Sequence, residues 1–138
     1  MTETSSTPPT VFHALQARDA AALIDYYVET FGFVVTAEYA EEGRGVVHHA
    51  ELRTPDGAGG LMLGTHQVGP WSREPGAAGA YVVVPEIDGL YDRVVNRGAD
   101  VVRPLAETDY GSREFTVRDP EGNLWSFGTY PGEPMPGA

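Results

Sequence analysis

The sequence predicts an α+β protein in which two βαβββ modules form a curved mixed sheet around a central cavity. Three observations lead to this fold class: two segments with helical periodicity, an apolar strand before each of them, and a closing hairpin with a similar turn in each half. Because the order of strand, helix, strand and hairpin is the same in both halves, an internal repeat explains the pattern better than a chance match between two common turns.

The first helix is expected between Asp19 and Gly32. Its apolar residues recur at steps of three and four, the spacing of one helical face: Ala22, Leu23, Tyr26, Tyr27 and Phe31. Asp19 is a suitable N-cap because its side chain can accept a hydrogen bond from the first turn, and Gly32 is a suitable C-terminal stop.

The second helix is expected between Glu86 and Gly98. Its apolar residues have the same spacing: Ile87, Leu90, Tyr91, Val94 and Val95. Either Asp88 or Glu86 supplies a negative charge to the first turn, where the helix dipole favours it. Gly98 then ends the helix.

Strands are expected before and after each helix and in the hairpin that closes each half. They lie within Val11–Ala17, Phe33–Tyr39 and His48–Thr65, and then within Ala80–Val84, Asp100–Leu105 and Ser112–Thr129. The hairpins turn at the matching sequences Thr54-Pro55-Asp56-Gly57 and Asp119-Pro120-Glu121-Gly122, and both close on Gly-Thr.

These elements predict one domain, residues 10–130, between a disordered lead (1–9) and a loose tail (131–138). Module 1 spans about residues 10–66 and module 2 about 79–130, and the Gly- and Pro-rich segment 67–78 links them. One helix covers only one face of a module's sheet, so the other face needs a partner. Two such faces turned toward each other would enclose a cavity, which is where a function is expected.

Composition excludes several classes of function. The 138 residues carry 9 basic and 20 acidic side chains, a net charge of −11, and all basic residues are arginine. This balance argues against nucleic-acid binding, which needs clustered positive charge. The absence of cysteine excludes disulfides and thiol catalysis and fits a cytoplasmic protein. No apolar run is long enough to span a membrane. The acidic surface either serves solubility or favours a cationic ligand.

The segments "RDAAALIDYYVETFGF", "LYDRVVNRGADVVRP" and "YGSREFTVRDPEGNLWSFGTY" resemble the vicinal oxygen chelate superfamily. This superfamily contains glyoxalase I, extradiol dioxygenases, and the fosfomycin and bleomycin resistance proteins. The resemblance covers Val11 to Tyr130 and implies the paired-module fold. It does not choose an activity, because the superfamily includes several reactions as well as pure binding.

In metal-dependent members, the resemblance places ligands in the first and last strand of each module. The corresponding positions here are Phe12, Met62, Gly79 and Ser126. These residues offer no imidazole or carboxylate to a divalent cation. The resemblance therefore implies a metal-free member without a cofactor, similar to the bleomycin resistance proteins.

Histidines offer one alternative to a metal-free site. A register shift by one residue would bring His13 to the first ligand position, but it would also move His13 to the opposite face of the strand. His13 is thus either a core or edge residue or, less favourably, a ligand. His48 and His49 point to opposite faces of a regular strand and cannot chelate together, and His66 follows Gly64-Thr65 at the border with the linker.

Strand alternation predicts which side chains line the cavity. The expected ligand-binding residues are Phe12, Gln16, His49, Glu51, Met62, Trp71, Tyr81, Tyr110, Glu114 and Ser126. The polar residues His49, Glu51 and Glu114 either face the cavity or face solvent at its rim. Trp71 is either a lid or an anchor of the linker, and Tyr110 either closes the other end of the cavity or holds its loop.

The preferred function is binding and sequestration of a bulky organic molecule, cationic or aromatic, such as a metabolite or antibiotic. The alternative is a metal-independent enzyme of lyase or isomerase type, with Glu51, Glu114 or His49 as the general base. A metal-dependent lyase or dioxygenase fits less well. The resemblance also implies a homodimer, and the sequence leaves open whether modules pair within one chain or between two.

Overall fold

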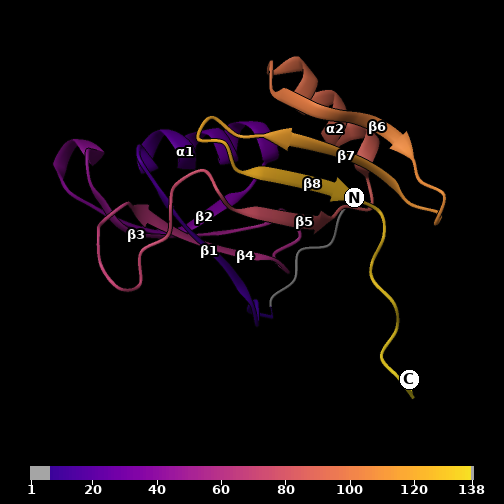
Figure 1. Cartoon of the computed structure of the whole chain (residues 1–138), viewed down its shortest axis with the longest axis horizontal. Coiled ribbons are helices and arrows are strands. Elements are labelled where there is room, and N and C mark those ends of the chain that lie inside the picture. Colours follow the sequence, from indigo (N-terminus) through magenta and orange to yellow (C-terminus); the bar gives the residue numbers. More distant parts are fainter. Residues whose placement is uncertain (1–6, 138) are drawn as a thin grey trace.

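The computed structural model describes residues 7–137 and contains two four-stranded sheets with one main helix each (Figure 1). Module 1 contains β1 (Phe12–Ala17), α1 (Ala20–Tyr26), β2 (Val34–Ala40), β3 (Val47–Arg53) and β4 (Gly60–Thr65). Module 2 contains β5 (Gly79–Val83), α2 (Ile87–Asn96), β6 (Asp100–Glu107), β7 (Arg113–Arg118) and β8 (Leu124–Gly128). The two βαβββ modules are confirmed, while residues 1–6 of the expected lead and residue 138 lie outside the described part.

The two sheets have the same topology, which confirms the internal repeat. Their strand orders are β1-β4-β3-β2 and β5-β8-β7-β6, with the first strand of each module parallel to its last. Phe12 pairs with Gly60 in the first sheet, and Gly79 pairs with Leu124 at the equivalent place in the second.

The first helix begins and ends as its sequence predicts. The Asp19 side chain accepts a hydrogen bond from the Ala22 backbone N–H at 3.1 Å, and Gly32 ends the segment in the left-handed region at φ 75°. Between them, α1 continues as one wider π-helical segment, η1 (Tyr27–Phe31). This widening, and a short 3₁₀ turn η2 (Glu42–Arg44), were not predicted.

Each sheet has an inner face, packed on the helices, and an outer face on the opposite side. Alternating residues of the central strands are buried on the inner face, including Leu61 and Leu63 in β4 and Trp125 and Phe127 in β8. The register puts Phe12, Met62, His49 and Glu51 on the outer face of module 1, and Tyr81, Ser126, Thr116 and Glu114 on that of module 2. The predicted alternation is therefore present in both modules.

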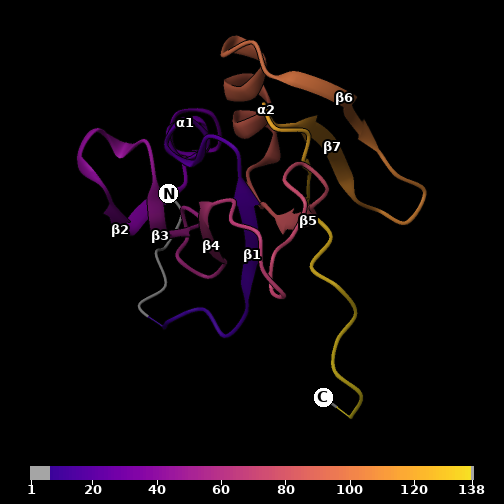
Figure 2. The same ribbon diagram turned by 60° about the vertical axis from the view of Figure 1, so that its left-hand side comes forward.

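The inner faces of both sheets share one core. The ring of Phe31, at the end of the first helical segment, lies 4.9 Å from Phe127 of β8, and Tyr27 lies 5.0 Å from Trp125. On the same inner face of module 2, Tyr91 of α2 packs on Phe115 at 5.1 Å, and Phe115 stacks on Phe127 at 5.2 Å. Each buried aromatic side chain contributes about 2–3 kcal/mol. The helices lie beside each other between the two sheets (Figure 2).

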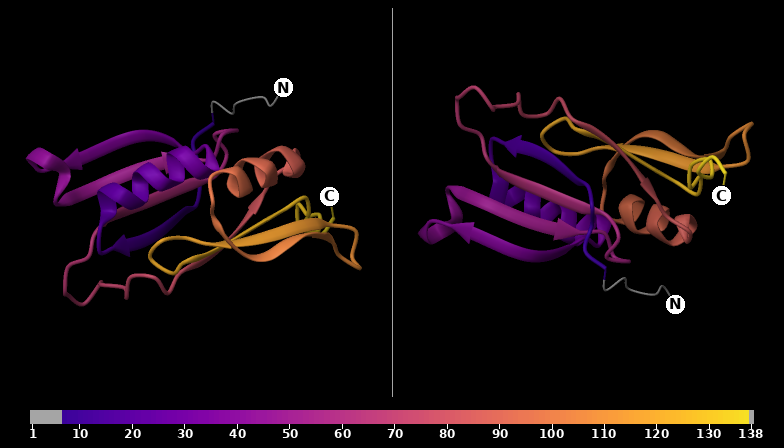
Figure 3. Two further views of the ribbon diagram at one scale, coloured as in Figure 1. Left: turned by 90° about the horizontal axis from the view of Figure 1, so that it is seen from above. Right: turned by 90° about the horizontal axis from the view of Figure 1, so that it is seen from below.

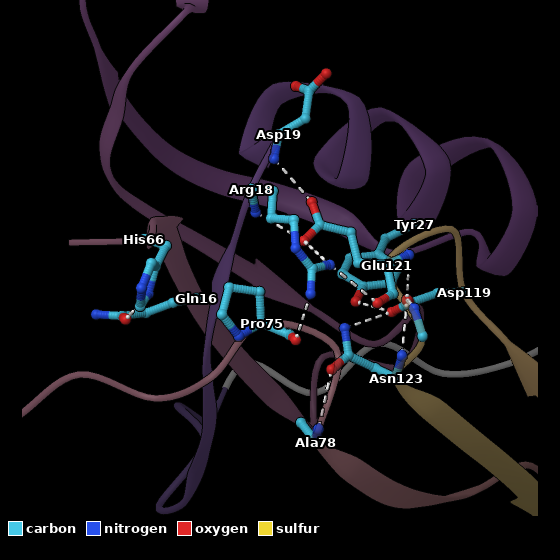
Figure 4. A network of polar contacts seen from close by, with 11 residues as sticks. Gln16, Arg18, Asp19, Tyr27, His66, Pro75, Ala78, Asp119, Glu121 and Asn123 are labelled. Carbon is cyan, nitrogen blue, oxygen red and sulfur yellow. Dashed lines mark hydrogen bonds and ion pairs between the residues drawn. The ribbon is translucent and has the colours of Figure 1, made fainter. Parts of the chain in front are cut away.

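The Asp-Pro-Glu-Gly-Asn turn of module 2 connects the modules through hydrogen bonds (Figure 4). The Glu121 carboxylate accepts from the backbone N–H groups of Arg18 and Asp19, at 2.7 and 2.8 Å, at the start of α1. Buried Asp119 accepts from the Tyr27 hydroxyl at 2.6 Å and from the Trp125 indole at 3.1 Å. This turn therefore has a structural role, which is consistent with a motif that marks the fold rather than an activity.

The modules lie side by side, with neither outer sheet face covered by the other module (Figure 3). β1 and β5 are edge strands of their sheets, and no ladder of hydrogen bonds joins them. Within residues 7–137, no helix is both long and apolar enough to cross a bilayer.

Candidate functional site

The outer face of module 1 carries an open cavity of about 410 Å³, here called the module 1 cavity. Four residues predicted to bind a ligand line it: Gln16, His49, Met62 and Trp71. Met62 supplies an adaptable thioether surface. Trp71 is 65% exposed, and its ring lies over Gly69 of the linker while it lines the cavity.

Gln16 has a structural task within the module 1 cavity. Its side-chain oxygen lies 2.9 Å from Nδ1 of His66 and accepts a hydrogen bond from the Arg73 backbone N–H at 3.1 Å. These contacts attach the linker that carries Trp71 to β1. The amide oxygen of Gln16 is therefore already in use, and its amide nitrogen remains the group offered to a ligand.

His49 and Glu51 form a pair on the outer face of β3. Nε2 of His49 lies 2.8 Å from Oε2 of Glu51, and the His49 ring stacks on Tyr39 at 6.3 Å. Both side chains are partly exposed. An imidazole oriented by a carboxylate is a chemically competent general base.

The outer face of module 2 carries a second cavity, of about 500 Å³, whose lining includes Tyr81, Tyr110, Glu114 and Tyr130. These four residues are here called the tyrosine pocket. The Tyr81 and Tyr110 hydroxyls donate to the two oxygens of Glu114, each at 2.7 Å. The Tyr130 backbone N–H donates to the Tyr81 hydroxyl at 3.3 Å, and the rings of Tyr110 and Tyr130 meet edge to face at 5.7 Å.

Glu114 is ionised at the base of the tyrosine pocket. Its burial raises the pKa, but hydrogen bonds from Tyr110, Tyr81 and Ser112, with the positive charge of Arg103, outweigh burial and bring the pKa below its usual value. The hydrogen bond to Glu114 raises the pKa of Tyr110, and burial raises that of Tyr81. The pocket thus combines a carboxylate anion with neutral phenols.

Three of the expected ligand-binding residues line neither cavity. Ser126 shares a hydrogen bond with Thr116 at 2.9 Å, and Thr116 accepts another from Arg103 at 3.0 Å. Phe12 lies over Gly60, where any larger residue would collide with its ring. Glu51 is held by His49 beside the module 1 cavity.

A cavity of about 380 Å³ lies between the modules, with His13 of β1 and Tyr81 of β5 in its lining, and each outer face also carries a cavity of its own. One outer face holds the module 1 cavity and the other holds the tyrosine pocket, and neither of these two is lined by both sheets. The physical reason is that the inner faces share the aromatic core, so the outer faces point away from that core. The sequence pattern could assign faces to side chains but not the angle between the two sheets.

The residues at the superfamily's four metal positions do not fit a metal. Phe12, Met62, Gly79 and Ser126 lie in β1, β4, β5 and β8 as expected, and they offer only a thioether and a hydroxyl. Nowhere in residues 7–137 do three His, Asp or Glu side chains gather in a way that could hold a cation.

His13 lies on the inner face of β1, away from the module 1 cavity and the tyrosine pocket. Its ring meets Trp125 edge to face at 5.5 Å, and its Nε2 is buried without a hydrogen-bond partner within the chain. Burial lowers the pKa of His13. His13 is therefore a partly buried residue at the edge of the core, in line with the preferred interpretation of a core or edge histidine. It lines the cavity of about 380 Å³ between the modules, where β1 and β5 approach each other.

Tyr130 was not among the predicted binding residues, although strand alternation contains a signal for it. Tyr130 lies four residues after Ser126 and so has the parity of the outer face. Alternation is reliable only within a strand, and β8 ends at Gly128, two residues before Tyr130, so the pattern alone does not assign Tyr130 to a face.

Comparisons with known proteins match nearly the whole chain. The model of the Glyoxalase/Bleomycin resistance protein/Dioxygenase superfamily matches residues 10–127. The uncharacterized proteins Rv0887c of Mycobacterium tuberculosis and Mb0911c of Mycobacterium bovis are 32% identical to this chain over 131 residues. The match covers 87% of this chain and 74% and 82% of the two relatives.

Solved structures with the same fold include TioX from Micromonospora sp. ML1. It is 28% identical, with a TM-score of 0.73, and the match covers 89% of this chain and 98% of TioX. A glyoxalase/bleomycin resistance protein from Streptomyces sp. CB03234 is 23% identical, with a TM-score of 0.66 and coverage of 83% and 94%; this likeness concerns the fold alone.

Proposed function

Because the chain belongs to the Glyoxalase/Bleomycin resistance protein/Dioxygenase superfamily, we propose that it is a metal-free member that binds and sequesters a bulky organic molecule. The ligand is aromatic, cationic or both, as expected of certain metabolites and antibiotics. A cytoplasmic site of action and a homodimeric state are part of this proposal.

One observation carries the proposal. The four positions that hold a metal in catalytic members carry Phe12, Met62, Gly79 and Ser126, which cannot replace imidazole or carboxylate ligands. Two open cavities remain on the outer faces: the module 1 cavity combines Met62 and Trp71 with polar side chains such as Gln16 and His49, and the tyrosine pocket has aromatic walls around Glu114. Such walls suit a largely apolar organic ligand, which is oriented by a small number of directed polar contacts.

The second candidate is a metal-independent enzyme, and the His49–Glu51 pair favours it. The carboxylate orients the imidazole at 2.8 Å, and His49 lines the module 1 cavity. In this function, His49 would take a proton from an acidic C–H group of the ligand and return it at another position.

A thermal-shift screen tests the proposal. Purified protein is heated with planar, cationic and glycopeptide compounds, in parallel samples with EDTA and with divalent metals. A compound at one hundred times its Kd should raise Tm by roughly 8 °C, with the same shift in both samples.

The fate of the compound distinguishes the candidate functions. Unchanged compound in mass spectra after prolonged incubation supports sequestration, while a product that disappears in His49→Gln supports the enzyme. Metal retained stoichiometrically through purification, or a shift that EDTA abolishes, would overturn the metal-free proposal.

A further inference from the structure

We infer that the tyrosine pocket binds an alkylated ammonium group, the positively charged part of an organic cation. This inference rests on the proposed function and adds to it the class of ligand and the residues that recognise it.

The shape of the pocket provides aromatic walls around a carboxylate. Tyr110 and Tyr130 are inclined at 74° to each other, so they form two adjoining walls, with Tyr81 as a third lining ring. The Glu114 side chain is 6% exposed and lies at the base. Gly128 is required below it, because a Cβ there would collide with the Tyr81 hydroxyl and the Glu114 side chain.

The charge at the base has no direct positive partner. Glu114 forms no ion pair with any residue of the range 7–137. The two nearby arginines have other partners: Arg103 donates to Thr116 at 3.0 Å, and Arg113 is bound to Asp88 at 2.8 Å. The pocket therefore presents a negative charge to its opening.

The hydrogen bonds to Glu114 strengthen the attraction of the rings for a cation. Tyr81 and Tyr110 both donate their hydroxyl protons to this carboxylate. Such donation polarises the phenol and increases the electron density on the ring face. A cation over an aromatic face is attracted by that density, and the arrangement of several rings around it is a known means of binding quaternary ammonium groups.

The same hydrogen bonds favour an alkylated ammonium group over an N–H-rich cation. Both Glu114 oxygens already accept a short bond, and both phenol protons are donated. A primary ammonium or guanidinium group would have to share the Glu114 oxygens with the two phenol donors, and each buried N–H donor left unpaired is costly. An alkylated ammonium group has few or no N–H donors and is recognised by charge and ring faces alone. The net charge of −11 attracts any cation from a distance.

The experiment compares choline with its neutral isostere, in which a tert-butyl group replaces the trimethylammonium group. The two probes have the same shape and differ in charge, so the difference isolates cation recognition. Each probe is titrated at low salt and its binding is followed by calorimetry and by proton NMR. Choline should bind about tenfold more tightly than the neutral isostere. Its N-methyl signals should move upfield, because they lie over the ring faces.

Variants locate the site. Tyr110→Leu removes a ring that is 58% exposed, so the fold should persist while the preference for choline and the upfield shift are lost. Tyr110→Phe retains the ring but not the hydrogen bond and should weaken binding less. The matched control is Tyr39→Leu, which removes a 63% exposed tyrosine from module 1 and should leave the preference for choline and the upfield shift unchanged. Glu114→Gln removes the negative charge of the pocket and should weaken choline binding. Its melting curve is measured first, to check that the variant is folded.

Equal affinity for the two probes would overturn the inference, and so would choline binding that survives Tyr110→Leu. These failures are distinct from failure of the proposed function. If screened compounds bind but choline is not preferred, the function stands and the ammonium site falls. If no compound of any class binds, the proposed function falls first.

Discussion

Side chains on β1 have different tasks because alternate residues lie on opposite faces. Phe12 and Gln16 lie on the outer face, where Gln16 holds the linker through His66 and Arg73. His13, between them in sequence, lies against Trp125 in the core. A difference of one residue thus moves a side chain from the outer face of the sheet to the face that packs on the core.

The burial of His13 predicts a pH dependence of stability. Burial lowers its pKa in the folded chain below the usual 6.5, so the unfolded chain binds the proton more readily as the pH falls. The neutral form of His13 therefore stabilises the fold fully above about pH 6.5, the pKa of the unfolded chain. This stabilisation decreases as the pH falls from about 6.5 toward the lower pKa of His13 in the folded chain. His13→Leu should remove this part of the decrease, as measured by urea unfolding between pH 7.5 and 5.5.

His48→Gln is the matched control for that measurement. His48 is on β3, its side chain is 55% exposed, and its Nε2 lies 3.3 Å from the Glu41 carboxylate. This variant should retain the decrease in stability that is due to His13. An identical pH profile for wild type and His13→Leu would show that His13 is accessible to protons in the folded protein.

At the scale of elements, the two helical segments hold the modules together. Arg93 of α2 reaches across to the end of the first helical segment and donates hydrogen bonds to the backbone carbonyls of Val28 and Glu29, at 3.0–3.1 Å. The last carbonyls of a helix lack hydrogen-bond donors within the helix and carry partial negative charge. An arginine supplies both the N–H donors and a positive charge. This contact complements the Glu121 carboxylate, which binds the opposite end of the same segment.

Replacement of Arg93 should therefore destabilise the chain more than replacement of a nearby surface arginine. Arg93→Met keeps most of the apolar side chain and loses the hydrogen bonds, so we expect a loss of about 1–2 kcal/mol in the free energy of unfolding. Urea denaturation measures this loss.

Arg97→Met provides the comparison on the same helix. Arg97 contacts the Glu29 carboxylate at 3.0 Å in an exposed ion pair, which is worth about 0–1 kcal/mol. If the two variants lose equal stability, the carbonyl contacts of Arg93 contribute no more than a surface ion pair.

At the scale of the whole molecule, one side of each sheet remains uncovered. Partly exposed aromatic and aliphatic side chains occur there, including Tyr39 and Trp71 in or beside module 1 and Tyr81 and Val83 in module 2. Sheets with one apolar face covered by helices need a second layer when the other face is also partly apolar. A second copy of the chain could supply that layer and close the open cavities.

We therefore expect a homodimer at micromolar concentration. Light scattering after size-exclusion chromatography should give about twice the chain mass of 14.8 kDa. Trp71→Arg is expected to weaken the dimer if the second copy covers the module 1 cavity, whereas Val68→Arg, in the same linker and 90% exposed, is its control. A concentration-independent monomer would refute this expectation.

Local chemistry allowed much of the fold to be predicted from the sequence. The spacing of Leu23, Tyr27 and Phe31, the N-cap Asp19 and the stop at Gly32 define the first helical segment, because these features act within a few residues. Strand alternation assigned Met62, Glu51, Tyr81 and Glu114 to their faces for the same reason. The non-ligating character of Phe12, Met62, Gly79 and Ser126 also needs no coordinates.

Only the tertiary structure decided how these parts meet. The contact of Phe31 with Phe127 joins the two sheets side by side, so that each outer face carries its own cavity while a further cavity lies between the modules. The grouping of Tyr81, Tyr110 and Tyr130 around Glu114 depends on loops and a C-terminal segment distant in sequence. Local patterns specify the face on which a side chain lies, while the angle between sheets comes from packing summed over the whole core.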